Sequence, residues 1–294
     1  MNPTIFLLSA ARAMVPITLA AIGEIITERA GVVNIGLEGI LLLSGLFSAV
    51  VSLATNSILL GVLTGVFVGL AIGALHALIS VTLRGNQIVS GVGINTFALG
   101  FVVVVLISLY GSYGQTPETP PIPRIPVAGG SISYFFIATL IIGALAWWAL
   151  FRTKWGLRLR AVGENPTAAD AMGINVFRIR IIATVLGAML TGLAGAYLVL
   201  DYVGYFTKHI SAGRGFIALA NVVFSNWNPL IALLGGFLFG FFEALAIYLQ
   251  IIYLSPSHQY VLKMIPYIAT LVIVSIAMKR VRPPAALGKP YSRE

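Results

Sequence analysis

The stretch AGVVNIGLEGILL at residues 30–42 has a counterpart, AGRGFIALANVVF, at residues 212–224. Each copy places glycines inside an apolar segment, and each is followed by a run with small residues every four positions. These stripes are Gly61, Gly65, Gly69, Gly73 and Ala77 after the first copy, and Gly236, Gly240 and Ala244 after the second. Small residues at this spacing let helix backbones approach closely in lipid. The pattern predicts two copies of one unit; the alternative is chance similarity between apolar glycine-rich segments.

The composition around these copies is that of a membrane protein. Of 294 residues, 59% are hydrophobic and 9% are charged, whereas soluble domains carry about 25% charged residues. Roughly 20 apolar residues suffice for one transmembrane helix. We therefore predict an all-α polytopic membrane protein of about 8–10 transmembrane helices, forming a single domain over residues 1–294. The apolar runs that we expect to form its helices are 4–22, 39–55, 58–83, 88–110, 131–151, 179–200, 213–226, 229–254 and 260–279.

Basic residues indicate the orientation of the chain. The net charge of +9 comes from Lys and Arg in short clusters between apolar runs, which is the positive-inside pattern and not a nucleic-acid-binding surface. One cluster occupies 152–180, and the other comprises Lys279, Arg280, Arg282, Lys289 and Arg293. We expect segment 152–178 and the C-terminal tail to be cytoplasmic, and the proline-rich loop 111–130 to lie outside.

Two regions leave the path of the chain open. Arg12 interrupts the first apolar run and no basic leader precedes it, so we expect this run to be a helix and not a signal peptide. Residues 23–38 are compatible with a broken helix or a loop, which leaves the side of the N-terminus undecided. The short run 213–226 is compatible with a re-entrant segment.

An odd number of spans separates the two copies, so they are expected to run in opposite directions. Inverted repeats with glycine-interrupted helices are typical of transporters, whose site lies near the midplane where the copies meet. Polar side chains in or near these runs are candidates to line a pathway, because such groups are costly in lipid. The candidate pathway residues are Asn34, Glu38, Asn95, Phe97, Phe216 and Asn221. The alternative for the amides is hydrogen bonding between helices, which we favour for the carboxylate of Glu243.

The sequence offers little for catalysis. His76, His209 and His258 share no metal-ligand spacing. Cysteine is absent, which excludes disulfides and cysteine-ligated metals. No Walker motif is present, so this chain cannot itself be the part that hydrolyses nucleotide.

The segment LRAVGENPTAADAMGI at residues 159–174 is expected to be a short helix between two spans. Asn165 and Pro166 are a helix-start signal, residues 168–172 favour helix, and Gly173 ends it. Its small residues offer a close-fitting surface to a partner, and a plain loop is the alternative.

Several motifs resemble one family. ERAGVVNIGLEG at residues 28–39 and GENPTAADAMGI at residues 163–174 resemble the permease subunits of ABC importers for branched-chain amino acids, simple sugars and nucleosides. NQIVSGVGIN at residues 86–95 and RGFIALA at residues 214–220 resemble the nucleoside (purine) branch, in particular its shorter permease. Ser225 departs from the family pattern, where glycine is expected.

The resemblance implies a set of partners in the cell membrane. These are a second homologous permease, an ATPase that binds the ATP, and an extracytoplasmic solute-binding lipoprotein, with membrane lipid around the bundle and no cofactor in this chain. It also implies that the cytoplasmic segment couples to the ATPase through Glu164, Asn165, Thr167, Ala168, Ala169, Asp170 and Gly173. The expected function is that of a non-enzymatic permease subunit that imports nucleosides.

Three alternatives remain at this stage. The first is an ABC permease for simple sugars or branched-chain amino acids. The second is an ion-coupled secondary transporter, for which Glu38 and Glu243 would be the only candidate ion or proton sites. A membrane-embedded enzyme is the third, although no acid–base pair or metal cluster supports it.

Overall fold

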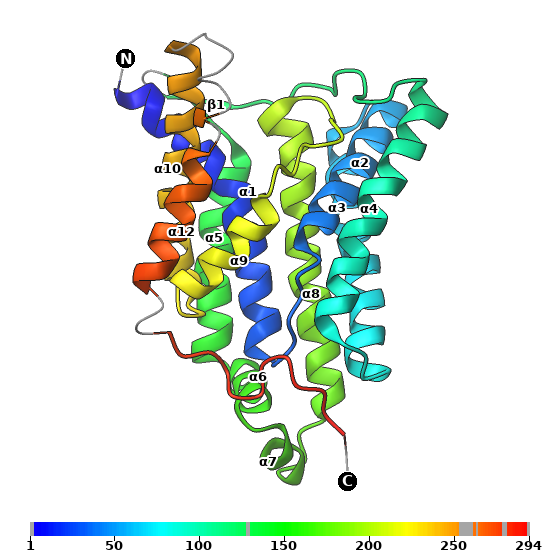
Figure 1. Cartoon of the computed structure of the whole chain (residues 1–294), viewed down its shortest axis with the longest axis vertical. Coiled ribbons are helices and arrows are strands. Elements are labelled where there is room, and N and C mark those ends of the chain that lie inside the picture. The colour runs from blue at the N-terminus through cyan, green and yellow to red at the C-terminus, as the bar shows by residue number, and fades with distance from the viewer. Residues whose placement is uncertain (1–2, 128–129, 253–260, 263, 278–280, 293–294) are drawn as a thin grey trace.

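In the computed structural model the chain folds into a bundle of apolar helices (Figure 1). The structure describes residues 3–127, 130–252, 261–262, 264–277 and 281–292. The first half contains α1 (Pro3–Arg29), α2 (Leu37–Thr55), α3 (Ile58–Ala77) with a π-helical continuation η1 (Leu78–Thr82), and α4 (Gln87–Tyr110). A short hairpin follows, of β1 (Ile125–Val127) and β2 (Gly130–Ile132). The second half contains α5 (Tyr134–Arg152), α6 (Lys154–Glu164), α7 (Pro166–Ala171), α8 (Val176–Tyr197) with η2 (Leu198–Val203), α9 (Arg214–Phe224), α10 (Pro229–Ile252) and α12 (Ile265–Ala277).

The predicted helices are confirmed, with shifted boundaries. Seven helices of the described chain are long and apolar enough to cross a membrane, and α9 and α12 are shorter apolar helices. The first helix extends to Arg29, beyond the predicted end at residue 22, because the polar side chains of Glu24, Thr27 and Glu28 are buried inside the bundle. The short helix α6 was not predicted. The last residues of the predicted runs 229–254 and 260–279, with basic residues Lys279, Arg280 and Arg293, lie outside the described residues.

Helices α1 and α8 cross at the centre of the bundle. Their backbones meet at Gly23 and Gly187, where a Cβ on either glycine would overlap the other helix. The two glycine stripes pack on this central pair, α3 against α8 and α10 against α1. Gly69 faces the backbone of Gly192 on α8, and Gly240 faces the backbone of α1 at Ala10. The stripes are therefore helix-packing surfaces, as predicted.

Two crossings of the bundle are interrupted. The chain leaves α1 at one end of the bundle, runs without helix through residues 30–36, and forms α2 only from Leu37 on (Figure 1). In the second half, residues 204–213 descend from the opposite end before α9 begins, and α9 completes the passage. Segment 213–226 is thus the helical half of a crossing and not a re-entrant segment. Residues 23–38 form a helix end and a break.

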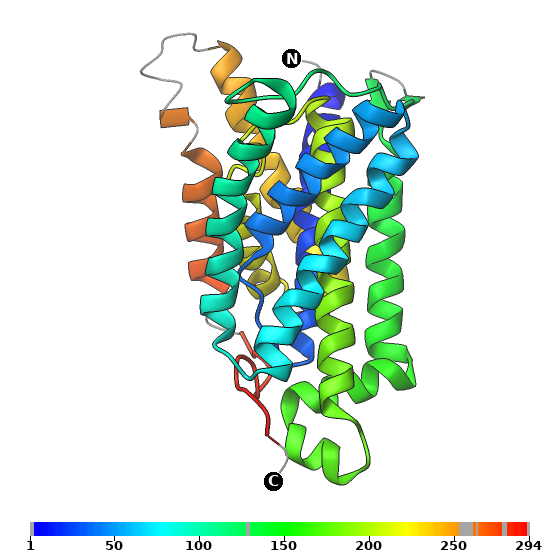
Figure 2. The ribbon, with the colours of Figure 1, turned by 90° about the vertical axis from the view of Figure 1, so that its right-hand side faces the viewer.

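The two ends of the bundle differ in what they carry. The start of α1, the loop 111–124 and the strands β1 and β2 lie together at one end, which we call the hairpin end (Figures 1 and 2). Helices α6 and α7 and the C-terminal residues 281–292 lie at the other, which we call the α7 end. The basic segment 152–178 and the described part of the tail thus lie at the same end of the bundle, as expected if both are on the same side of the membrane.

Labelling of single cysteines tests the orientation. The chain has no cysteine of its own, and Glu118 at the hairpin end and Ser292 at the α7 end are both exposed. Because Lys and Arg concentrate at the α7 end, the positive-inside rule predicts that this end is cytoplasmic. In intact cells, an impermeant thiol reagent should label Glu118→Cys and leave Ser292→Cys unlabelled until the membrane is opened. The reverse pattern would contradict the topology.

Candidate functional site

The two interrupted crossings meet at the Glu38 carboxylate. Glu38 lies in the first turn of α2, and its two oxygens accept hydrogen bonds from the backbone N–H groups of Gly213 (2.7 Å) and Gly215 (2.8 Å). These N–H groups are at the start of α9, where the first turn of a helix leaves its donors unpaired. A carboxylate there satisfies them and interacts favourably with the positive end of the helix dipole. One repeat copy therefore caps the helix of the other.

Glycine is required at both of these contacts. Gly213 has a φ of +75°, a left-handed conformation that disfavours other residues. A Cβ on Gly215 would overlap the backbone of Glu38. The pattern Gly-Arg-Gly in the second copy thus allows the carboxylate of the first copy to approach the helix start.

The first break, residues 30–36, is held by side chains from three helices. Glu24 on α1 accepts a hydrogen bond from the Asn34 N–H (2.7 Å), and Gln87 on α4 accepts one from the Val33 N–H (2.7 Å). The His76 ring on α3 lies 3.0 Å from the Val33 carbonyl. Non-helical backbone at membrane depth needs such partners, because lipid offers none.

Asn95 on α4 holds the start of α2. Its side-chain oxygen accepts a hydrogen bond from the Gly39 N–H (2.7 Å), and its NH₂ group donates to the Ile35 carbonyl (3.0 Å). Both ends of the amide are therefore engaged with the backbone of the first break. This is the interhelical hydrogen bonding that stood as the alternative to solute contact.

The second crossing is held by charged groups. The Arg214 guanidinium at the start of α9 forms an ion pair with Glu243 on α10. The hydroxyl of Tyr202 on η2 donates to the same carboxylate (3.1 Å). Glu243 is thus a buried carboxylate bonded between helices, as the sequence interpretation favoured.

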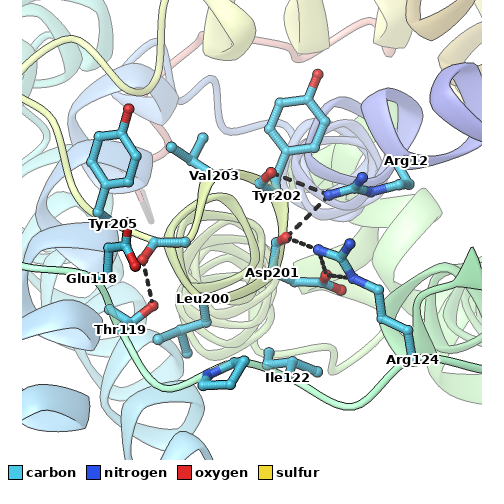
Figure 3. A pocket seen from close by; sticks show the side chains of 12 residues that line it. Arg12, Glu118, Thr119, Ile122, Arg124, Leu200, Asp201, Tyr202, Val203 and Tyr205 are labelled. Carbon is cyan, nitrogen blue, oxygen red and sulfur yellow. Dashed lines mark hydrogen bonds and ion pairs between the residues drawn. The ribbon is translucent and has the colours of Figure 1, made fainter.

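A cavity of about 570 Å³ lies at the hairpin end above η2 (Figure 3). Asp201 is buried beneath it and pairs with Arg124 of the loop (2.8 Å) and with the Ser133 hydroxyl. Arg12 donates to the backbone carbonyls of Asp201 and Tyr202 (both 3.2 Å). The ion pair of Arg124 with Asp201 and the bonds from Arg12 to backbone carbonyls fasten the loop and α1 to the end of α8.

The six candidate pathway residues are not all brought together. Asn34, Glu38 and Asn95 lie in or beside the first break. Phe216 follows Gly215, which binds Glu38, and 51% of its surface is exposed. Phe97 is exposed and stacks on Phe101 of its own helix (centroids 5.1 Å apart). By helical geometry it lies on the flank of α4 that carries Ser90, away from Asn95. Asn221 is fully buried and donates to the Ala232 carbonyl (3.0 Å) on α10.

The short helix predicted within residues 159–174 exists as α7. The Asn165 side chain caps it by accepting a hydrogen bond from the Ala168 N–H (3.0 Å), Pro166 is its first residue, and Gly173 follows it at a φ of +80°. Glu164, Asn165, Thr167, Ala168 and Gly173 are exposed, and Asp170 is half-buried.

One expectation about this surface is wrong. Ala169 was expected to contact the ATPase together with Ala168, but it is 4% exposed and packs into the core. A helix of this length shows opposite faces to the protein and to solvent, and Ala169 is on the inner face. The outer face carries Thr167, Ala168, Ala171 and the strongly exposed Met172 (82%).

Several residues that hold the site were missed. Arg180, Arg214 and His76 were given no role in the site. Arg180, for example, is 2% exposed and donates to the Ala30 carbonyl (3.2 Å) of the first break. A charged or polar residue at the end of an apolar run was the available signal, because such a group needs a partner. The identity of the partner required the fold.

A multi-pass bundle in which two interrupted helices meet inside the protein is the architecture of a transport permease. The chain belongs to the family described as branched-chain amino acid transport system / permease component, whose model matches residues 6–274. It is therefore a non-enzymatic permease of the cell membrane.

Three similar proteins span almost the whole chain. It is 36% identical to the nucleoside ABC transporter permease protein NupC of Lactococcus lactis subsp. cremoris, with 94% of this chain and 93% of that one covered. It is also 36% identical to the guanosine ABC transporter permease protein NupQ of Bacillus subtilis, with 94% and 92% covered. It is 33% identical to the putative glucose ABC transporter permease protein TsgC13 of Haloferax volcanii, with 94% of each covered. No solved structure gives a significant match.

Removing the Glu38 carboxylate tests the junction of the two copies. Glu38→Ala leaves the first N–H groups of α9 without their acceptor, and hydrogen bonds to a charged group contribute about 1.5–3 kcal/mol. We expect the free energy of unfolding in detergent to fall by about this amount. Glu38→Gln retains one acceptor oxygen, so its free energy of unfolding should lie between those of Glu38→Ala and the unaltered chain.

The matched control is Glu118→Ala in the exposed loop, which should leave unfolding unchanged. Equal stability of Glu38→Ala and the unaltered chain would show that the carboxylate does not fasten α9.

Proposed function

We propose that this chain is the permease subunit of an ABC importer for nucleosides. The observation that carries the proposal is its similarity, over 94% of its length, to permeases named for nucleosides and for guanosine. The NQIVSGVGIN and RGFIALA motifs support the same solute class. A sugar is the competing solute, because the putative glucose permease is 33% identical.

The proposed assembly contains a second, homologous permease subunit, an ABC ATPase and an extracytoplasmic solute-binding lipoprotein. The ATP is bound by the ATPase, and membrane lipid surrounds the permeases. Exposed apolar side chains on α3 and α4, such as Phe67 (66%) and Val104 (60%), provide surface for lipid or for the second permease.

The proposed solute pathway passes the junction of the two copies. We assign Asn34, Glu38, Asn95, Phe97, Phe216 and Asn221 to it, with different roles. Phe216 is exposed beside the Glu38 junction and offers an aromatic face to a planar base. Asn34, Glu38 and Asn95 fix the backbone at that point, and Asn221 fixes α9 on α10. Phe97 would contact solute from the α3 flank of α4.

An ion-coupled carrier is the function of a different class. It would need an intramembrane carboxylate available to an ion or a proton. Glu38 is engaged by two backbone N–H groups, and Glu243 is paired with Arg214. These bonds favour energy input from a partner ATPase over ion coupling.

Uptake by the complete complex tests the solute and the energy source. In proteoliposomes that contain the permeases and the ATPase, with the binding protein on the side of solute entry, labelled guanosine should accumulate only when ATP is supplied on the ATPase side. Excess unlabelled nucleosides should compete, and glucose and leucine should not. Phe216→Ala should lower the uptake rate several-fold without changing the amount of complex, since it removes a surface side chain.

Phe67→Ala, the same change at an exposed phenylalanine on α3 (66%), is the matched control. Competition by glucose alone would identify a sugar permease, and uptake driven by an ion gradient without ATP would contradict the ABC assignment.

The proposed coupling surface is the outer face of α7. We propose that the ATPase docks on Thr167, Ala168, Ala171 and Met172, with Glu164, Asn165, Asp170 and Gly173 shaping the helix and Ala169 packing it against the bundle. Met172→Arg adds a large charged group at the most exposed point of this surface. It should reduce the ATPase recovered with the purified permease at least tenfold without reducing membrane insertion.

Glu118→Arg introduces the same side chain at the hairpin end and should leave ATPase recovery unchanged. Full recovery of the ATPase with Met172→Arg would place the docking surface elsewhere. Ala169→Arg is unsuitable for this test, because its side chain would enter the core and disturb the fold.

A further inference from the structure

The C-terminal residues 281–292 cross the α7 end of the molecule as an extended strap (Figure 1). Pro284, Ala286 and Tyr291 are buried in it, and Leu287 packs on the core that includes Ala169. Three prolines, at 283, 284 and 290, limit its backbone freedom.

The strap is bonded to the first break. The Gly288 N–H donates to the Gly31 carbonyl (3.1 Å), and the Ala286 N–H donates to the Gly163 carbonyl (2.9 Å) at the end of α6. The buried guanidinium of Arg180 on α8 joins both segments, because it donates to the carbonyls of Ala30 (3.2 Å) and Lys289 (2.9 Å). The planar fork of arginine suits this double contact.

The strap is also bonded to the second crossing. The Arg282 N–H donates to the Asn226 side chain (2.9 Å) in the turn that follows α9. The same turn is held by α1, since the Arg29 guanidinium donates to the Trp227 carbonyl (3.1 Å). A displacement of the strap would therefore act on the end of α9 as well as on residues 30–33.

The third attachment is to α7. The Tyr291 hydroxyl donates to the Asp170 carboxylate (3.0 Å), and its ring packs against Phe177 at the start of α8 (centroids 5.5 Å apart). The Ala285 N–H approaches the Glu164 carboxylate (3.3 Å) just before α7. Tyr291 is 9% exposed and Asp170 is half-buried, so the contact is partly shielded from water.

We propose that the strap 281–292 carries the displacement of α7 to both interrupted crossings, with Tyr291 and Arg180 as its positioning residues. This inference rests on the proposed function, in which the ATPase acts on α7. The strap is attached at α7, at the first break and at the turn after α9. A rigid segment with attachments at these three places moves them together.

Tyr291→Phe tests the proposal in the complete complex in proteoliposomes. It removes the hydroxyl that binds Asp170 and leaves the ring against Phe177. We expect the ratio of solute-stimulated to basal ATP hydrolysis to fall about tenfold or more, because a hydrogen bond to a charged group contributes at least about 1.5 kcal/mol and 1.36 kcal/mol is a factor of ten in rate. The ATPase should remain bound and basal hydrolysis should persist. Tyr134→Phe, the same change at an exposed site on the hairpin end, is the control.

A chain that ends at Val281 is the second variant, and it should lose stimulation at least as completely. An unchanged stimulation ratio for Tyr291→Phe, with the ATPase bound, would overturn the proposal. If the shortened chain does not assemble, Tyr291→Phe decides alone. Met172→Arg distinguishes failure of the proposed docking site from failure of the proposed strap. If Met172→Arg leaves the ATPase bound and transport active, the ATPase does not dock on α7. If Tyr291→Phe alone leaves the stimulation ratio unchanged, only the role of the strap is refuted.

Discussion

The bundle depends on one constraint, which is that backbone groups freed at a helix break inside an apolar medium must find partners within the protein. Two crossings of the bundle contain non-helical backbone, at residues 30–36 and 204–213. The chain meets the constraint by placing these two segments next to each other. The Glu38 carboxylate of the first copy binds the first N–H groups of α9 in the second copy. Side chains from α1, α3 and α4 bind backbone groups of Val33 and Asn34 in the first break. The same interactions that stabilise the breaks therefore hold the two halves together.

Much of the fold could be predicted because its signals are local. Apolar runs gave the helices, and the stripes that contain Gly69 and Gly240 gave their packing surfaces, which in the structure face α8 and α1. The short helix α7 was predicted from Asn165, Pro166 and Gly173, whose effects act within one turn. The internal repeat predicted that the two copies run in opposite directions and meet near the middle of the bundle. Glu38 was therefore a candidate for this meeting point, although its bonds to α9 were not predicted.

What could not be predicted depends on orientation and on distant partners. A helix of six residues does not reveal which alanine faces inward, so Ala169 was assigned to the wrong face of α7. Amides in apolar runs can bind a solute or a neighbouring backbone, and the contacts of Asn95 and Asn221 are with backbone. Arg180 donates a hydrogen bond to the carbonyl of Lys289 in the strap, although the two residues are 109 positions apart in the sequence. No local pattern connects residues at such a separation.

The crossing of α1 and α8 at Gly23 and Gly187 has a consequence for the substitutions that the chain can tolerate. Each of these helices precedes one of the two interrupted segments, and their backbones touch without any intervening side chain. A methyl group on either glycine would overlap the other helix. Neither position can gain an atom unless the opposite helix moves, so a substitution at one glycine has to be accompanied by a shift within the central pair on which α3 and α10 pack.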